Sequence, residues 1–464
     1  MKKITHNFVM LSMIAAWLFC GLSFTACTSD IADNPVVIPD PQPQPNVEGF
    51  FTPEINRLID ENYPDVVANG YAKLVIPKSM YKQGLFVFPA TATSDMEAMV
   101  AAGYKVYVNG GTVRDGVMGK EAHDVDFTTD ADIMNIKDVL PHAVAFNAFR
   151  DIWVAKAYHG DELETDIAPM FSIFPELSGK ADIPVASNPG SPYCNDLLED
   201  TYSRDYTINA MYYDYATGDI IDYHGGLHDL RDGILHTVFN ADLSVSTDAR
   251  KYFRAPRFAA KYNLTIDPEL DKAFKNHTDV MKDIDENNAV YQTVSGFDGG
   301  FALAFYKLLE QYQVTDFFYS SMKDYQHTEA YDGFVEGILG AFDKTGKVDM
   351  ALCYAAIFWP RFVAEIAGKD NPTADDMDAA WKAIDEANAP ALRFEKESYG
   401  DYSYAPTFIK DVWLLQLLMT ADDNMTDAKA ADIKSKDHYA EALQFLKARA
   451  TLDSSLQKYA DYWK

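Results

Sequence analysis

The sequence is poor in cysteine and in basic residues. It has 4 cysteines among 464 residues, and its 40 lysines and arginines face 70 aspartates and glutamates, for a formal net charge of −30. Affinity for RNA or DNA comes largely from Lys and Arg contacts to phosphate. The charge therefore opposes nonspecific nucleic-acid binding, although a local basic strip remains compatible with it.

The few cysteines argue against a disulfide framework. Cys20 lies in a segment that we expect to be removed, and Cys27 lies at its edge. Cys194 and Cys353 then remain, in different predicted domains, so no structural disulfide is expected.

Residues 1–26 have the pattern of an export signal. Lys2 and Lys3 provide its charged start, and Phe8–Leu22 is an apolar run too short and too N-terminal for an ordinary transmembrane helix. Phe24–Cys27 resembles a lipoprotein cleavage box, which predicts lipidation of Cys27. An ordinary signal peptide cut near Ala26 is the alternative.

Residues 27–50 are predicted to be a flexible linker. Ser29-Asp30 resembles the acidic tether that sends some Gram-negative lipoproteins to the cell surface, and the Pro-rich PDPQPQP string indicates extended chain. We expect an exported monomer at the outer membrane or cell surface, anchored by lipid. The periplasmic face is the alternative location.

The remaining chain indicates an α+β protein. Hydrophobic residues make up 48% and aromatic residues 13% of the composition, as in a folded globular protein. Residues 51–245 mix short strand-like and helical patterns and form a predicted α/β head. Helical patterns without a fixed-period repeat follow, as a neck (246–325) and a body (326–464).

Several elements are predicted within the head. Residues 131–145 are expected to be helical, and Ser94 with Glu97 has the spacing of a capping box at a helix start. Hairpins are expected from Ile152–Ala157 with Glu162–Ile167, and from Ile208–Tyr213 with Ile220–Tyr223.

The stretch Val106–Thr129 has the most informative pattern. A short apolar run leads into Gly110-Gly111, a helix-like segment with Arg114-Asp115 follows, and Asp124 and Asp126 close it. Glycines allow close approach of the backbone to a phosphate, and a helix N-terminus favours an anion. This order predicts a nucleoside triphosphate site.

Asp124 and Asp126 are candidate metal ligands. On a strand, their spacing places both carboxylates on one face, with Val125 and Phe127 on the core face. Hard oxygen ligands suit Mg²⁺, so we expect two Mg²⁺ ions, with Mn²⁺ as an option. In so acidic a chain, acid-x-acid triplets also arise by chance, and the pair alone proves nothing.

These residues resemble the class II nucleotidyltransferases, which comprise tRNA CCA-adding enzymes and bacterial poly(A) polymerases. The resemblance runs with gaps from about residue 75 to 450, and its poly(A) polymerase branch fits better through VIPKSMY, YAAIFWP and DVWLLQL. It implies catalytic and metal roles for Asp124 and Asp126. The further nucleotide-binding positions that match its motifs are Gly110, Gly111, Arg114, Asp115, Arg204, Asp205, Asn209, Asp248, Arg254 and Arg257, and Lys251 is a nucleotide-binding candidate that stands where the family has an arginine.

The individual roles have physical alternatives. Glu164 is the choice for a third metal carboxylate, with Asp166 as the alternative on the same strand face. Asp205 and Asn209 share a face if they lie on a helix, and are expected to hydrogen-bond ribose hydroxyls. For Arg204 with Asp205, a structural ion pair is the alternative. Trp359 and Trp413 are interpreted as core aromatics.

The departures from the family pattern cluster at base selection and RNA contact. Ile167-Ala168-Pro169 lacks the expected arginine, Ser203 replaces another, and Lys251 cannot present the planar donor edge of a guanidinium. Asn109 replaces an apolar residue, and Pro256 lies inside a predicted helix.

Two classes of function are therefore predicted. The first is a two-metal transfer of a nucleoside monophosphate from ATP or another triphosphate to an acceptor hydroxyl, usually an RNA 3′ end in this family. The second is a surface lipoprotein that binds a nucleotide or partner on the same fold without turnover. A non-RNA acceptor is a third option.

Overall fold

The computed structural model describes residues 49–121, 125–149, 152–160, 165–172, 177–188, 191–284, 286–369, 372–389, 394, 396–397 and 400–464. The chain divides into two compact units. One holds the described residues up to Thr247 together with Tyr262–His277, and the other holds Asp248–Lys261 with Thr278–Lys464. Cys194 and Cys353 are both free and buried.

The first unit, the head, is built on an eight-stranded sheet with the order β1-β8-β7-β2-β3-β6-β5-β4. Its β3–β6 pair is parallel and its other pairs are antiparallel. The strands are β1 (Leu74–Ile76), β2 (Val106–Asn109), β3 (Val125–Thr129), β4 (Ala143–Phe149), β5 (Ile152–Ala157), β6 (Thr165–Pro169), β7 (Tyr212–Asp214) and β8 (Ile220–Asp222).

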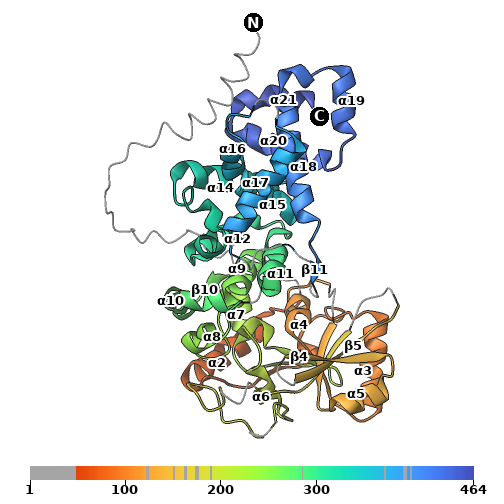
Figure 1. Cartoon of the computed structure of the whole chain (residues 1–464). Coiled ribbons are helices and arrows are strands. Elements are labelled where there is room, and N and C mark those ends of the chain that lie inside the picture. Colours follow the sequence, from red (N-terminus) through yellow and green to blue (C-terminus); the bar gives the residue numbers. More distant parts are fainter. Residues whose placement is uncertain are drawn as a thin grey trace, which may run out of the picture. The chain divides into compact units, whose positions relative to one another are not determined.

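Helices connect and cover these strands, and a short parallel pair, β9 (Ile234–Leu235) with β10 (Thr265–Ile266), completes the head. Figure 1 shows α5 beside β4 and β5. The head helices are α2 (Pro53–Asn69), α3 (Ala90–Ala101), α4 (Gly110–Val117), α5 (Ile133–Val139), α6 (Leu197–Thr201), α7 (Gly226–Asp232), α8 (Ala241–Ser246) and α10 (Pro268–Asn276), with 3-10 turns η1 (Lys78–Met80) and η2 (Thr207–Asn209).

The second unit is helical apart from the short pair β11 (Lys396–Glu397) with β12 (Gly400–Asp401). Its helices are α9 (Lys251–Tyr262, whose last residue belongs to the head), α11 (Glu286–Phe297), α12 (Ala302–Gln311), α13 (Val314–Phe318), α14 (Glu329–Asp343), α15 (Met350–Ile357), α16 (Trp359–Glu365), α17 (Ala374–Ala387), α18 (Ala405–Met419), α19 (Asp427–Lys434), α20 (Tyr439–Leu452) and α21 (Gln457–Tyr462), with 3-10 turns η3 (Thr278–Asp283), η4 (Ser320–Met322), η6 (Asp422–Asn424) and η7 (Ser454–Leu456). The predicted α+β class is thereby confirmed.

Buried aromatic side chains hold the helical unit together. Trp413 is fully buried, donates from Nε1 to the carbonyl of Ala355 at 2.9 Å and stacks on Phe362 with ring centroids 4.4 Å apart. Trp359 is also buried, with the Arg449 guanidinium 4.3 Å from its ring centroid. Both tryptophans are core residues, as predicted.

Two local predictions in the head were wrong. The helix expected over 131–145 is α5 alone, because Pro141 disfavours helical geometry at Leu140, and the chain turns into β4. The helix expected to start at Ser94 begins at Ala90, after Pro89. Proline presets the backbone for a helix start, so Ser94 and Glu97 lie inside α3 and cap nothing.

The strands of both predicted hairpins pair, β5 with β6 and β7 with β8, and both pairs are antiparallel. The strand predicted over Ile208–Tyr213 was wrong in its first half, because Thr207–Asn209 form η2 and β7 begins at Tyr212. Among the residues that the structure describes, none of the helices is both long and apolar enough to cross a membrane.

Candidate nucleotide and metal site

Three neighbouring strands bring polar side chains to the same level of the sheet. Asp126 on β3 is the register partner of Asp166 on β6, which is in turn the partner of Lys156 on β5. Val125 and Phe127, on either side of Asp126, are buried. Because side chains alternate along a strand, Asp126, Asp166 and Lys156 share the face opposite to that core.

The N-terminus of α4 lies against this face. Gly110, its first residue, has φ +62°, a backbone conformation that residues other than glycine rarely adopt. A methyl group on Gly110 would lie 3.6 Å from Oδ2 of Asp126. The next turn adds Thr112, whose Oγ1 lies 3.5 Å from the backbone N–H of Asp126. The predicted glycine turn and the predicted carboxylate therefore meet.

The donor set fits the divalent ions that the fold implies. Asp126 and Asp166 present oxygen ligands from adjacent strands, and the first residue of α4 lies close to the Asp126 carboxylate. Lys156 lies 3.4 Å from Oδ1 of Asp166 through its Nζ, and this ion pair already balances that carboxylate. Asp124 and Glu164 lie outside the described residues, as does Cys27.

Arg114 joins the two motifs of the head. Its buried guanidinium donates through Nη1 to Oδ1 of Asn209, through Nη2 to the hydroxyl of Tyr262, and through Nε to Asp115 at 3.0 Å. Tyr262 in turn donates to Asp115 Oδ1 at 3.0 Å, and the Arg114 guanidinium lies 4.3 Å from its ring centroid.

Asn209 and Asp205 are brought together, but by a different local structure from the expected helix. Asn209 closes the 3-10 turn η2 and Asp205 precedes it. The Asn209 amide donates to Asp205 Oδ1 at 2.9 Å while its oxygen accepts from Arg114. The amide therefore positions Arg114 and Asp205, which leaves Asp205 as the group of this pair suited to a ribose.

Arg204 is held by buried partners within the head. Its Nη2 donates to Asp200 at 3.0 Å, and its Nη1 donates to Asn109 Oδ1 at 3.1 Å. Asp200 also accepts the hydroxyl of Tyr212 at 2.6 Å. Burial would lower the pKa of Arg204, but Tyr212 and Asp200 raise it above its usual value. Asn109, a departure from the family pattern, thus has a structural partner.

A second network of buried hydrogen bonds contacts η2. Asp229 on α7 accepts the hydroxyl of Thr207 at 2.6 Å and lies 3.0 Å from Nδ1 of His236. Burial opposes protonation of His236, but Asp229 and Asp267 raise its pKa to about 9. Gly226 packs so closely that a methyl group there would lie 2.3 Å from the carbonyl oxygen of Thr207.

The predicted residues of the neck lie in the second unit. Asp248 pairs with Arg250, from Nε at 2.7 Å, and more distantly with Lys251, whose Nζ is 3.9 Å away. Although burial would raise the pKa of Asp248, these cations lower it. Arg254 and Arg257 both lie over the ring of Phe258, at 5.5 and 5.0 Å from its centroid. The two arginines thus gather on one face, as their spacing predicted.

Tyr262 is a site residue that the sequence analysis did not single out. The available signal was the spacing of Arg254, Phe258 and Tyr262, which at four-residue intervals share one helix face. A tyrosine there predicts a polar tip beside the two arginines. Its bond to the distant Arg114 depends on tertiary structure alone.

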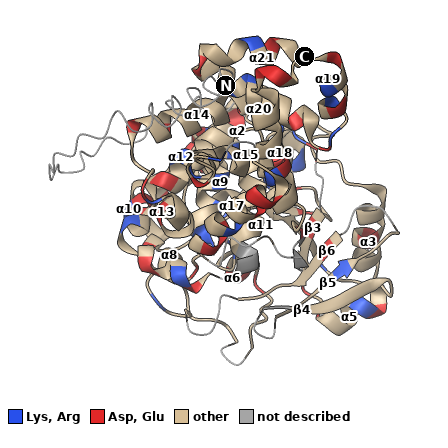
Figure 2. Ribbon diagram, turned by 45° about the horizontal axis from the view of Figure 1, so that its top comes forward, with Lys and Arg blue, Asp and Glu red and all other residues tan. Residues whose placement is uncertain are grey.

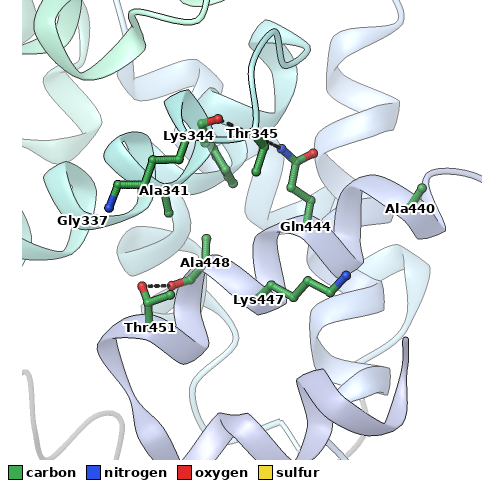
Figure 3. Close-up of a pocket in the computed structure, with 10 residues that line it drawn as sticks. Gly337, Ala341, Lys344, Thr345, Ala440, Gln444, Lys447, Ala448 and Thr451 are labelled. Atoms are coloured by element: carbon green, nitrogen blue, oxygen red, sulfur yellow. Dashed lines mark hydrogen bonds between the residues drawn. The ribbon is translucent and has the colours of Figure 1, made fainter.

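A pocket in the helical unit involves none of the predicted site residues. It lies between α14 and α20, and Figure 3 shows its lining side chains. Gln444 donates to Thr345 Oγ1 at 2.6 Å across the two helices.

Figure 2 shows acidic and basic residues interspersed on outer helices such as α10 and α19.

Comparison with known proteins shows which proteins this head resembles. Residues 106–236 match the family described as the poly A polymerase head domain. The head is therefore similar to that domain over this range. The matched range contains both the Val106–Thr129 stretch and the motif from Arg204 to Asn209, which the structure shows joined through Arg114.

Full-length relatives agree with this assignment. Poly(A) polymerase I of Escherichia coli O157:H7 is 26% identical over 413 residues, covering 84% of each chain. The CCA-adding enzyme of Lactiplantibacillus plantarum is 33% identical over 190 residues, or 41% of this chain and 44% of that one. The predicted class, nucleotidyltransferase, is confirmed by these relatives.

Solved structures agree on the fold. The CCA-adding enzyme of Thermotoga maritima, complexed with tRNA, superposes with a TM-score of 0.54 at 18% identity and covers 84% of this chain and 86% of that one. A tRNA nucleotidyltransferase complexed with a primer tRNA and an ATP analogue gives 0.53 at 19% identity, covering 79% of this chain and 97% of that one.

Replacing Tyr262 by Phe is expected to destabilise the head. The change removes one hydroxyl that accepts from Arg114 and donates to Asp115, so a buried guanidinium and a partly buried carboxylate each lose a partner. We expect a loss of about 1–3 kcal/mol in the free energy of unfolding, read as a lower melting temperature of the full chain. Tyr404→Phe, which removes an exposed hydroxyl contact to Asp349, is the matched control. Equal losses in the two variants would contradict the role assigned to Tyr262.

Proposed function

We propose that this chain transfers a nucleoside monophosphate from ATP or another nucleoside triphosphate to an acceptor hydroxyl. The observation that carries the proposal is the approach of Gly110, at the start of α4, to the Asp126 carboxylate. A triphosphate bound at the helix N-terminus then has its phosphates beside the carboxylate face of β3 and β6. Two of the relatives named above are a poly(A) polymerase and a CCA-adding enzyme.

The protein's own part in this reaction is positioning. Asp124, Asp126 and Glu164 would hold Mg²⁺ or Mn²⁺, which when bound supplies charge for the phosphates and the leaving pyrophosphate. Arg114 fixes Asn209 and Asp115, and Asn209 fixes Asp205 toward the ribose. Little covalent work is required, because phosphoryl transfer depends on alignment and electrostatics.

An RNA 3′ end is the acceptor that the relatives favour. The solved neighbours include complexes with tRNA. Against it stand the net charge of −30 and the loss of guanidinium groups at Ser203 and Lys251. The paired Arg254 and Arg257 over Phe258 are the local cationic group suited to a phosphate or a base. A protein, sugar or metabolite hydroxyl is the alternative acceptor.

The second candidate is a nucleotide- or partner-binding protein without turnover. The observation that favours it is that Arg114, Arg204 and Asn209 form hydrogen bonds with other side chains of the head. Such residues would be retained for stability even in a domain that had lost catalysis.

The activity can be measured on the full chain with α-labelled ATP. Wild-type protein with Mg²⁺ or Mn²⁺ should release pyrophosphate and label an added RNA. Asp124→Asn and Asp126→Asn should each lower the rate by about 100-fold or more, because the loss of one carboxylate weakens metal binding. The matched control is Asp130→Asn, whose exposed carboxylate only accepts the backbone N–H of Lys105.

Two results would overturn the enzyme proposal. One is pyrophosphate release that is unchanged in both Asp124→Asn and Asp126→Asn. The other is thermal stabilisation by triphosphate without any turnover on RNA or on small hydroxyl acceptors, which supports the binding protein instead.

The third carboxylate can be assigned by comparing two substitutions. Asp166 is paired with Lys156, which supports Glu164 as the ligand. Glu164→Gln is therefore expected to raise the Mg²⁺ concentration for half-maximal rate at least about tenfold, and Asp166→Asn to change it by less than about twofold. The reverse order would assign the role to Asp166.

We also propose that Cys27 carries a lipid anchor after removal of residues 1–26. In a Gram-negative host, the full chain should incorporate labelled palmitate, and Cys27→Ser should abolish the label. Cys20→Ser is the matched control, since it lies in the removed segment and should leave labelling intact. Absence of label in the wild type, with cleavage near Ala26, would instead identify an ordinary exported protein.

A further inference from the structure

A second group of metal-ligating side chains lies in the head, apart from the carboxylate strands. It combines Asp95 on α3 with His142, directly before β4, and His159, two residues after β5. The antiparallel register pairs Ala143 with Ala157, so the two histidines emerge at the same end of the β4–β5 hairpin. The two histidines, which lie 47 and 64 positions after Asp95 in the sequence, therefore contact the same carboxylate.

The three side chains converge through their ligating atoms. Nε2 of His142 lies 2.9 Å from Oδ1 of Asp95, and Nε2 of His159 lies 2.8 Å from Oδ2. All three groups offer ligand atoms within 4.8 Å of one another. The imidazole rings lie side by side with centroids 4.7 Å apart.

The three side chains differ in burial in a way that suits a metal site open to solvent on the histidine side. The Asp95 side chain is 2% exposed, while those of His159 and His142 are 20% and 37% exposed. A carboxylate this deep requires cationic or hydrogen-bonding partners. The accessible imidazoles leave a path by which an ion reaches it.

We propose that Asp95, His142 and His159 bind one Zn²⁺ ion. Two imidazole nitrogens and one carboxylate oxygen are a common three-ligand set for zinc, with water in the fourth position. Zinc–ligand bonds of about 2.0–2.1 Å in a tetrahedron separate the ligand atoms by roughly 3.3 Å. The two nitrogen–oxygen contacts, which go to different oxygens of Asp95, are a few tenths of an ångström shorter than this, and the ligand atoms that lie up to 4.8 Å apart must move closer together.

Binding of the ion changes the proton positions on the imidazoles. Each ring offers the Nε2 lone pair to zinc and keeps its proton on Nδ1, so the hydrogen bonds to Asp95 are replaced by bonds to the metal. The ion would tie α3 to both strands of the β4–β5 hairpin, at the end where β4 begins and β5 ends. His159 stands five residues before Glu164 in the sequence, so this tie fixes the start of the connection into β6.

The site is distinct from the catalytic carboxylates. Asp126 lies on β3, and β6 separates β3 from β5 in the sheet. The ligand chemistry also differs, because imidazole nitrogen favours zinc whereas an all-oxygen set favours Mg²⁺. Zinc at Asp95 should therefore persist in excess Mg²⁺ and in a variant lacking the Asp126 carboxylate.

The test uses the untagged full chain in detergent, stripped with a chelator and dialysed against Zn²⁺ with excess Mg²⁺. Zinc content by mass spectrometry should be one per chain in the wild type and in Asp126→Asn. His142→Ala and His159→Ala should each weaken zinc binding by more than the roughly 10- to 100-fold that loss of an outer-shell partner costs. His277→Ala removes another Asp-paired histidine of the head and should retain the zinc.

Two outcomes overturn the proposal. One is zinc content below one per five chains in the wild type, and the other is zinc that His142→Ala and His159→Ala both retain. Circular dichroism shows whether the variants fold. If they do not, Co²⁺ added to the wild type decides: visible bands of tetrahedral Co²⁺ that Zn²⁺ removes support the site, and their absence refutes it.

Discussion

The bond between Arg114 and Asn209 is the constraint on which the candidate site depends. It connects two segments 95 residues apart, the helix that follows the glycine turn and the 3-10 turn that follows Arg204 and Asp205. The guanidinium is buried, so its charge is tolerated only because Asp115, Asn209 and Tyr262 surround it with acceptors. Removing one partner leaves the others around an incompletely satisfied cation. The glycine turn and the motif from Arg204 to Asn209 are thereby held in one geometry.

The departures from the family pattern are partly explained by the same logic. Asn109 looks misplaced at the end of an apolar strand, yet its buried oxygen accepts from Arg204, which Asp200 holds from the other side. Ser203 donates to the backbone carbonyl of Asp200 at 2.6 Å and keeps the local turn closed. The serine at position 203 therefore has a structural partner of its own. For Lys251 the pairing with Asp248 preserves charge, but not the two-pronged geometry of a guanidinium.

The sequence predicted individual helices and strands better than it predicted the side-chain contacts between them. Strand-like patterns predicted β5 and the face of Asp126, and helical patterns predicted that residues 246–464 are helical, because these patterns are local. Asn209 was assigned to a helix face from a spacing of four, but a 3-10 turn brings the same residues together. Tyr262 and the Asp95 cluster were missed, since each depends on contacts between segments that no local pattern links.

The distinction between a catalytic and an inherited domain depends on which motif residues the fold itself needs. Arg114, Arg204 and Asn209 are internal, and their hydrogen bonds alone justify their presence. Asp126 and Asp166 stand in register on adjacent strands, on the face away from the core, where like charges repel. Lys156 forms an ion pair with Asp166 and offsets part of this repulsion. A repulsion of this kind is what a metal-dependent site retains and what a purely structural domain would be free to lose.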